Sequence, residues 1–130
     1  MVVSVACPND YQPDPIVLDF AKNNGKFSMT TSPVEAAVNA DVIFSDVWAS
    51  MGQESEAEKR RIAFTGYQVN DEVMGAAHAE CMVQHCLPAH RGEEITEKVF
   101  EAHANEIFDE AENRLHAQKA VLVKVLGKQE

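Results

Sequence analysis

The chain alternates short β-branched or apolar runs with stretches that carry helix-start signals, and this alternation limits its fold more than any other feature. The runs predict strands at residues 2–7, 26–31, 41–47 and 81–87. Strands that alternate with helices form a parallel sheet with right-handed crossovers. We therefore predict an α/β fold in which a single parallel sheet is flanked by helices, within one domain of 130 residues.

Helix starts are marked by capping residues. Asp14 before Pro15 predicts an N-cap with proline at the first helical position, and the sequence SPVE at 32–35 predicts a capping box. Further helices are expected from Ser55 to Ala63, from Asn70 to Ala79, from Thr96 to Ala104, and from a cap at Asp109 that follows a short extended piece at 106–110.

Composition excludes several classes of function. The 11 Lys and Arg residues against 21 Asp and Glu give a net charge of −10, which argues against non-specific nucleic-acid binding. No apolar run reaches the roughly 18–20 residues of a membrane helix, and the N-terminus does not resemble a signal peptide. Three irregularly spaced cysteines predict free thiols and a cytoplasmic location. Because a strand-like run follows Met1 directly, we expect a chain cut at a domain boundary.

Three polar segments follow predicted strands: CPNDYQPD at 7–14, DVWASMGQE at 46–54, and HCLPAHRGEE at 85–94. In open parallel sheets, ligands bind outside the carboxyl ends of the strands. We therefore expect two of these segments to form the site.

Metal and nucleotide sites are not expected there. Cys81, His85, Cys86 and His90 include ligand types, but side chains alternate between faces along a strand, so they would not point the same way. The sequence has neither a G-x-G-x-x-G motif nor a P-loop.

Two residues at predicted strand ends are candidates for chemistry. Cys86 is either a small buried hydrophobe or a substrate-facing thiol. Pro88 stops its strand and leaves carbonyl groups that an amine or amide substrate would satisfy, and the Leu87–Pro88 bond is a candidate for the cis form. Asp46 is an acid inside an apolar run, where it is either a helix cap or surface charge, or the partner of a cation.

Arg114 is the third candidate. It is expected one turn into the helix capped by Asp109, where its charge opposes the helix dipole. It is either an ordinary surface residue or the partner of an anion.

Together, the segments at 46–54, 85–94 and 109–120, supported by GYQVN at 66–70 and CPNDYQPDP at 7–15, resemble the ornithine-binding half of the ornithine carbamoyltransferases. The resemblance runs over essentially the whole chain. It implies a three-layer, Rossmann-like fold and transfer of a carbamoyl group from carbamoyl phosphate to the δ-amine of L-ornithine, without cofactor or metal. Such a reaction belongs to arginine biosynthesis or the urea cycle.

The resemblance also implies roles for particular residues. Asp46 and Ser50 would hold the α-amino group of ornithine, the Met51 backbone would assist with its carboxylate, and the loop at 50–52 would close over the substrate. Cys86 would lie near the reacting amine. The Cys86 and Leu87 carbonyls would accept hydrogen bonds from the carbamoyl nitrogen, and Arg114 would reach carbamoyl phosphate.

The chain departs from the family in one large respect. The S-T-R-T-R phosphate loop and the H-P-x-Q segment of the family do not occur in these 130 residues. We therefore expect the chain alone to be inactive. The helix at 109–128 would pack on the missing carbamoyl-phosphate domain, so self-association or a separate N-terminal-half partner is expected. A stand-alone amino-acid-binding or assembly module without catalysis remains the alternative.

Overall fold

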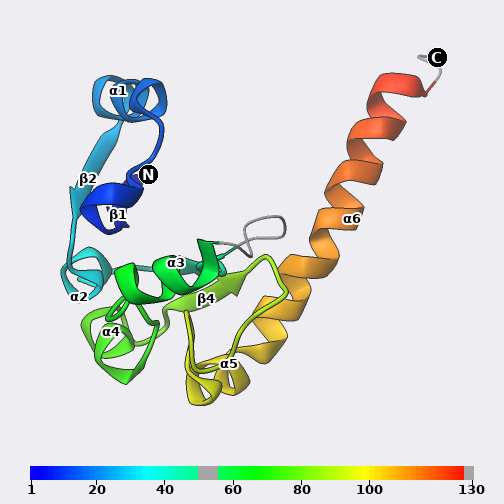
Figure 1. Cartoon of the computed structure of the whole chain (residues 1–130). Helices are drawn as coiled ribbons and strands as arrows, with labels where there is room; N and C mark the ends of the chain where they lie inside the picture. The colour runs from blue at the N-terminus through cyan, green and yellow to red at the C-terminus, as the bar shows by residue number, and fades with distance from the viewer. Residues whose placement is uncertain (50–55, 128–130) are drawn as a thin grey trace.

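The structure is a computed structural model that describes residues 1–49 and 56–127. Strands and helices alternate along the chain, as predicted (Figure 1). The predicted α/β class, with parallel strands flanked by helices, is confirmed. The elements are β1 (Val2–Ala6), η1 (Asn9–Tyr11), α1 (Pro15–Asn24), β2 (Lys26–Thr30), α2 (Pro33–Ala37), β3 (Val42–Ser45), α3 (Ala57–Ala63), α4 (Asp71–Ala76), β4 (Met82–His85), α5 (Glu97–Ala102) and α6 (Ala104–Leu126).

Two predicted helix caps are present. The Asp14 carboxylate accepts a hydrogen bond from the Ile16 amide at 2.8 Å, with Pro15 at the first position of α1. The Ser32 hydroxyl accepts one from the Glu35 amide at 3.3 Å and starts α2. The cap expected at Ser55 lies outside the described residues.

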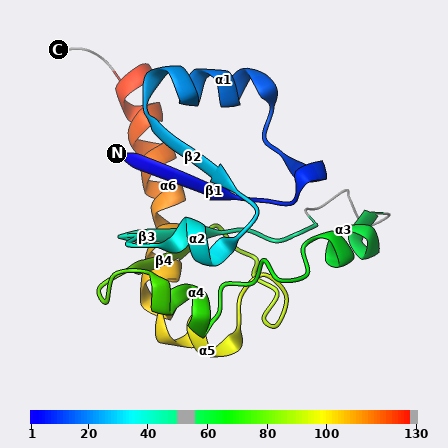
Figure 2. The same cartoon turned by 90° about the vertical axis from the view of Figure 1, so that its left-hand side faces the viewer.

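The prediction of a single sheet is wrong for the described residues. The strands form two separate parallel pairs, β1–β2 and β3–β4, and no hydrogen-bonded ladder joins them. Figure 2 shows the β1–β2 pair above the β3–β4 pair. Apolar runs identify strands, but they do not state which strands become lateral neighbours, so the sequence could not reveal this division.

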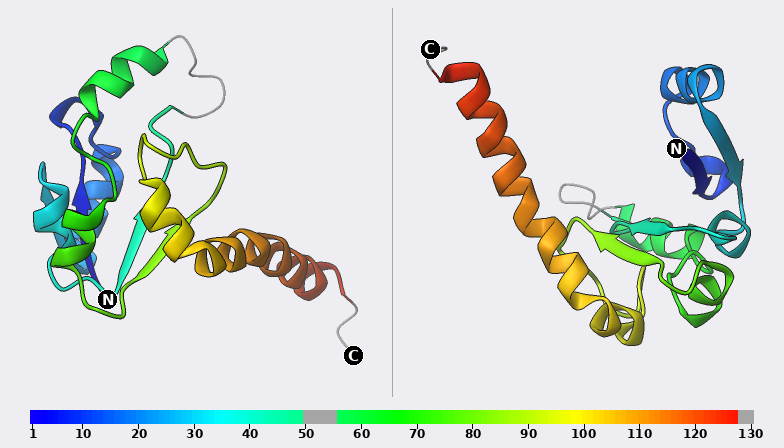
Figure 3. Two further views of the ribbon diagram at one scale, coloured as in Figure 1. Left: turned by 90° about the horizontal axis from the view of Figure 1, so that it is seen from below. Right: turned by 180° about the vertical axis from the view of Figure 1, so that it is seen from behind.

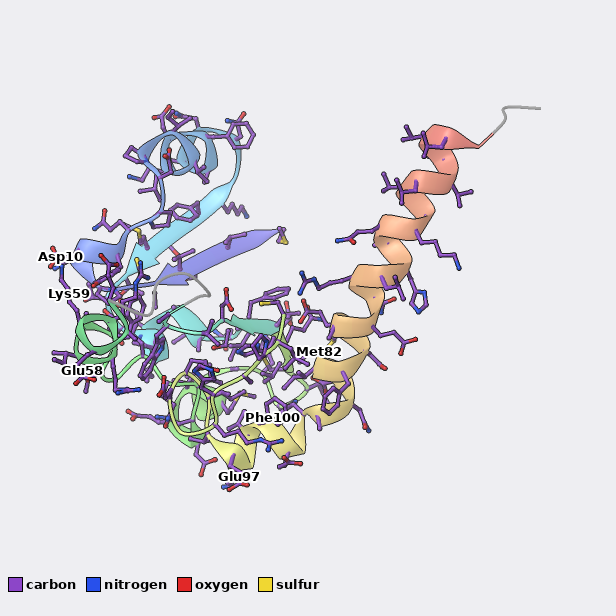
Figure 4. All side chains as sticks on the ribbon, turned by 45° about the vertical axis from the view of Figure 1, so that its right-hand side comes forward. Asp10, Glu58, Lys59, Met82, Glu97 and Phe100 are labelled. Atoms are coloured by element: carbon purple, nitrogen blue, oxygen red, sulfur yellow. The ribbon has the colours of Figure 1, made fainter. Side chains whose placement is uncertain are left out.

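The core lies around β4. Its buried side chains come from α2, α4, β4, α5, the first turn of α6 and the segments before α4 and α5: Ala37, Val69, Val73, Val83, Ile95, Val99, Phe100 and Ile107. Phe100, labelled in Figure 4, is 4% exposed and packs edge-on against Phe108 of α6. This packing fixes the N-terminal part of α6 against β4 and α5.

The expectations for the last helix are corrected by the structure. Residues 106–110 are helical rather than extended, and α6 begins at Ala104, not after a cap at Asp109. The reason is tertiary: Ile107 is completely buried in the core, and the helical turn around it presents that side chain inward.

The C-terminal part of α6 projects away from the remaining elements (Figures 1 and 3). Its apolar side chains Leu115, Val121, Leu122, Val123, Val125 and Leu126 are exposed. We call these six residues the α6 apolar side. Within the described residues, no helix combines the length and apolarity needed to cross a membrane.

Candidate active site

The site lies where β3 and β4 end side by side. These strands are parallel, and their last residues, Ser45 and His85, are direct partners in the ladder. The next residues, Asp46 and Cys86, are therefore also neighbours. The Cys86 thiol donates a hydrogen bond to the Asp46 carboxylate, with 3.2 Å between Sγ and Oδ1. Two of the segments that follow predicted strands therefore meet, as expected, at the rim of the β3–β4 pair.

The environment of Cys86 disfavours its thiolate. Burial raises the pKa of the thiol, and the hydrogen bond and negative charge of Asp46 raise it further, as does the charge of Glu110. Arg114 acts in the opposite direction and lowers the pKa, but it does not outweigh the other effects. In this state Cys86 is a protonated hydrogen-bond donor, which suits a binding group better than a ready nucleophile.

Arg114 belongs to the same site. It projects from α6, is exposed, and donates a hydrogen bond from Nη1 to the Cys86 carbonyl at 3.0 Å. Arg114 does not lie one turn from a helix N-terminus as predicted, because α6 begins at Ala104 and Arg114 lies well inside it. Within residues 1–49 and 56–127, its hydrogen-bond partner is a neutral carbonyl rather than an anion. A carbonyl oxygen has two lone pairs, so the Cys86 carbonyl retains one acceptor position.

The remaining predicted residues divide into two groups. Leu87 lies in the turn after β4, where the Leu87–Pro88 bond is cis, as the sequence suggested, and Leu87 has a positive φ of 54°. That left-handed conformation costs roughly 1–2 kcal/mol for a residue with a side chain. Ser50 and Met51, together with Gly52 of the expected closing loop, lie outside the described residues.

Sequence reasoning missed one pair of functional interest. His85 was considered only as a metal ligand, yet its side chain is fully buried beside that of Glu94, with exposed fractions of 0% and 1%. The atoms His85 Nε2 and Glu94 Oε1 are 3.2 Å apart. The available signal was a histidine in an apolar run followed by an acidic pair, but their approach depends on the intervening turn.

Glu94 is ionised in this environment. Burial is the largest single effect and raises the pKa of its carboxyl group, but the opposing contacts, led by hydrogen bonds from His85 and from the His90 amide, together lower it by more, so the net pKa lies below the ordinary value. The second oxygen, Oε2, is buried and has no hydrogen-bond partner among the residues that the structure describes.

The four residues of ligand type that the sequence analysis set aside, Cys81, His85, Cys86 and His90, do not form a ligand group among the described residues. Among residues 1–49 and 56–127, the group that metal-ligand spacing selects is His90, Glu93 and Glu94, whose ligand atoms lie within 4.8 Å of one another. Glu93 is already bound to the Arg61 guanidinium at 2.9 Å, which places a positive charge against the group. We assign no metal to it.

A cavity of about 120 Å³ lies at the carboxyl ends of the other strand pair. Its lining residues are Cys7, Asn9, Gln12, Met29, Thr30 and Thr31. It includes neither Asp46 nor Cys86 and is therefore separate from the site at the end of β3–β4.

Comparison with known proteins relates this geometry to a family. Residues 1–125 match the model of the aspartate/ornithine carbamoyltransferase Asp/Orn-binding domain. The chain is 52% identical over 130 residues to the ornithine carbamoyltransferase of Thermococcus kodakarensis, covering 96% of this chain and 41% of that protein. It is 50% identical over 130 residues to the ornithine carbamoyltransferase of Archaeoglobus fulgidus, and this match covers 99% of this chain and 42% of that protein.

Solved structures agree. The ornithine carbamoyltransferase from Pyrococcus furiosus superposes with a TM-score of 0.86 at 48% identity, covering 99% of this chain and 43% of that one. The anabolic ornithine carbamoyltransferase from Campylobacter jejuni superposes with a TM-score of 0.90 at 36% identity, covering 98% of this chain and 44% of that one. The chain thus spans about two-fifths of the length of the curated relatives it matches.

Proposed function

The chain belongs to the aspartate/ornithine carbamoyltransferase family and is its Asp/Orn-binding domain, and from this premise we propose that it binds L-ornithine as part of a carbamoyltransferase. The whole reaction converts carbamoyl phosphate and L-ornithine to L-citrulline and phosphate. The observation that supports this proposal most strongly is the contact of Cys86 with Asp46 at the rim of β3–β4. It brings a carboxylate and a thiol to one accessible edge.

Each site residue has a proposed role. Asp46, together with Ser50, binds the α-amino group of ornithine, because a carboxylate is a strong partner for an ammonium group. The Met51 backbone assists with the ornithine carboxylate. Cys86 lies beside the δ-amine, and the Cys86 and Leu87 carbonyls accept hydrogen bonds from the carbamoyl nitrogen. Arg114 binds the phosphate oxygens, for which a guanidinium offers two parallel donors.

The chemistry follows from these positions. The neutral δ-amine of ornithine attacks the carbonyl carbon of carbamoyl phosphate, a C–N bond forms, and the C–O bond to phosphate breaks. Phosphate leaves with the electron pair and takes up the one proton that the amine loses. Fixing the amine at the strand ends lowers the entropic cost of this encounter.

These 130 residues alone are proposed to be inactive, since they contain no S-T-R-T-R loop to hold phosphate. Activity then requires a polypeptide that binds carbamoyl phosphate, and the α6 apolar side is the proposed contact surface. The free thiols of Cys7, Cys81 and Cys86 favour a reducing compartment such as the cytoplasm.

Binding is tested by nuclear magnetic resonance titration of the isotope-labelled chain with L-ornithine, which detects weak complexes. We expect saturable shifts at Asp46, Cys86 and Leu87, and their loss in Asp46→Ala. Asp19→Ala, which removes an exposed carboxylate from α1, is the matched control and should bind as the wild type does. Shifts that spread evenly over the surface, or that survive Asp46→Ala, would contradict the proposal.

The α6 apolar side favours a second candidate, an assembly role without catalysis. Its six side chains are exposed, and an apolar surface of this kind usually pairs with another. Sedimentation velocity at rising concentration would detect self-association, and Leu122→Glu should weaken it. Self-association in a chain that does not bind ornithine would favour the assembly role over the enzymatic one.

A further inference from the structure

The buried pair of His85 and Glu94 has no place in the chemistry proposed above. His85 ends β4 and Glu94 lies nine residues later, beyond the turn that contains Cys86 and Leu87. Neither side chain reaches solvent. An ionised carboxylate is costly to bury unless other groups satisfy it, so the contacts of this pair need an explanation.

The hydrogen bonds determine which nitrogen of His85 holds the proton. The Leu87 amide donates to His85 Nδ1 at 3.0 Å, so Nδ1 must present a lone pair. The proton therefore resides on Nε2, which donates to Glu94 Oε1 at 3.2 Å. The carboxylate thus selects the tautomer in which the opposite nitrogen can accept the Leu87 amide.

The same carboxylate oxygen closes the turn from its far side. Glu94 Oε1 also accepts a hydrogen bond from the His90 amide at 2.6 Å. Both ends of the segment from Leu87 to His90 are therefore tied to one buried pair. The Glu94 backbone carbonyl accepts from the Val69 amide at 2.8 Å, which anchors the pair to the strand-like segment before α4.

The tied segment has an unfavourable backbone. Leu87 adopts a φ of 54°, a left-handed conformation that residues with a Cβ rarely take. Its amide is the one that His85 accepts. Strained residues of this kind persist where surrounding contacts determine their conformation.

The backbone of Leu87 determines where the preceding residue points. The Cys86 thiol contacts Asp46 at 3.2 Å, and the Cys86 carbonyl accepts from Arg114 at 3.0 Å. If Leu87 relaxed to an extended conformation, the peptide plane between Cys86 and Leu87 would rotate and the carbonyl would turn away from Arg114.

We propose that His85 and Glu94 are positioning residues: the Nε2–H tautomer of His85, held by Glu94, accepts the Leu87 amide and thereby orients Cys86 and its carbonyl toward Asp46 and Arg114. The importance of this orientation for ornithine rests on the proposed function. The hydrogen-bond arrangement itself does not, and it is measured without substrate.

Two variants of His85 separate its two contacts. In His85→Asn, the amide oxygen lies near the position of Nδ1 and can accept the Leu87 amide. In His85→Gln, the longer side chain places an amide nitrogen near the position of Nε2, where it can donate to Glu94 but leaves Leu87 without its acceptor. Both substitutions put an uncharged amide at the same buried site. If His85 only filled space there, the two variants would therefore protect the Leu87 amide equally.

The first measurement is hydrogen exchange of the Leu87 amide in the 130-residue chain. We expect protection in His85→Asn within about twofold of the wild type and a loss of roughly fivefold in His85→Gln, as for one net hydrogen bond. Equal protection in both variants, or greater loss in His85→Asn, would overturn the proposal.

The second measurement uses the wild type and so does not depend on the folding of a variant. Nitrogen resonance spectra of the histidine rings should show His85 Nδ1 unprotonated and Nε2 protonated. A proton on Nδ1 would also overturn the proposal.

The third measurement is the L-ornithine titration of the same proteins. His85→Asn should bind like the wild type, and His85→Gln about fivefold more weakly. If the wild type does not bind L-ornithine, the proposed function fails, while hydrogen exchange and the ring spectra still decide the positioning role.

Discussion

Replacing Asp46 by asparagine should make the Cys86 thiol more reactive. The substitution removes a negative charge 3.2 Å from Sγ but keeps the side-chain shape and one hydrogen-bond acceptor. The Asp46 charge and hydrogen bond are among the causes that raise the pKa of Cys86 above its ordinary value. Without the negative charge, more of the thiol is ionised at a given pH.

The size of the effect follows from the distance. Two unit charges 3.2 Å apart repel by about 1.3 kcal/mol in a water-like dielectric, which is the appropriate medium because Asp46 is exposed. This distance is well inside the Debye length of ordinary buffers, so salt removes little of the repulsion. A free energy of that size increases the thiolate population roughly ninefold. A more acidic thiol is also a weaker nucleophile, which reduces the net gain in rate to about threefold.

The assay is reaction with an aromatic disulfide below the pKa of the thiol, followed by mass spectrometry of the resulting peptides. Peptide resolution separates Cys86 from Cys7 and Cys81, whose burial raises the pKa of each thiol. Asp19→Asn makes the same change in charge on α1 and is the matched control. Glu110→Gln removes a more weakly acting carboxylate and should give a smaller increase than Asp46→Asn.

The reasoning is refuted if Cys86 reacts at equal rates in Asp46→Asn and Asp19→Asn, or more slowly in the former. Either result would mean that the carboxylate does not face the thiol in solution. It would also remove the main support for a shared substrate site at the ends of β3 and β4.

Three further predictions concern neighbouring features. Arg114→Ala should slow the reaction of Cys86 with the same disulfide, because the guanidinium lowers the pKa of that thiol. Ile107→Ala should reduce the free energy of unfolding by about 2–5 kcal/mol in urea titrations, since the side chain is completely buried, whereas exposed Leu115→Ala should change it by less than about 0.5 kcal/mol. Glu94 has a lower pKa in the folded chain, so its ionised form stabilises the fold above the ordinary value of 4.5, and this contribution is lost as pH falls through the folded pKa. The stability difference between wild type and Glu94→Gln should therefore narrow in acid, as measured by urea midpoints against pH.

Sequence patterns predicted the helix caps and strand ends that depend on contacts between residues close together in the chain. The caps at Asp14 and Ser32 depend on side chains that satisfy amides two or three residues away, so the sequence was sufficient to find them. The strand that ends in His85 was visible as an apolar run stopped by Pro88. The sequence also predicted that segments following parallel strands meet at one edge, but not which two; the pairing of β3 with β4 in the structure brings Asp46 beside Cys86.

Other features depend on contacts that the sequence does not display. The start of α6 is fixed by Ile107, which enters a core formed by segments far away in the chain. The sequence EIFDE at 106–110 was interpreted as a short extended piece, which does not indicate that role. The pairing of His85 with Glu94 likewise requires the turn between them to close, and no local pattern states that it does.

The contact of Arg114 with the Cys86 carbonyl links the two substrates of the proposed reaction. A guanidinium binds a phosphate group more strongly than a neutral carbonyl, because the bonds to phosphate are charge-assisted and paired. Arg114 is exposed, so its exchange of the carbonyl for an arriving phosphate requires little rearrangement. The exchange leaves both lone pairs of the Cys86 carbonyl free to accept the amide of the same carbamoyl phosphate. Under the proposed function, carbamoyl phosphate therefore releases a second acceptor position on the carbonyl that orients it toward the amine held at Asp46.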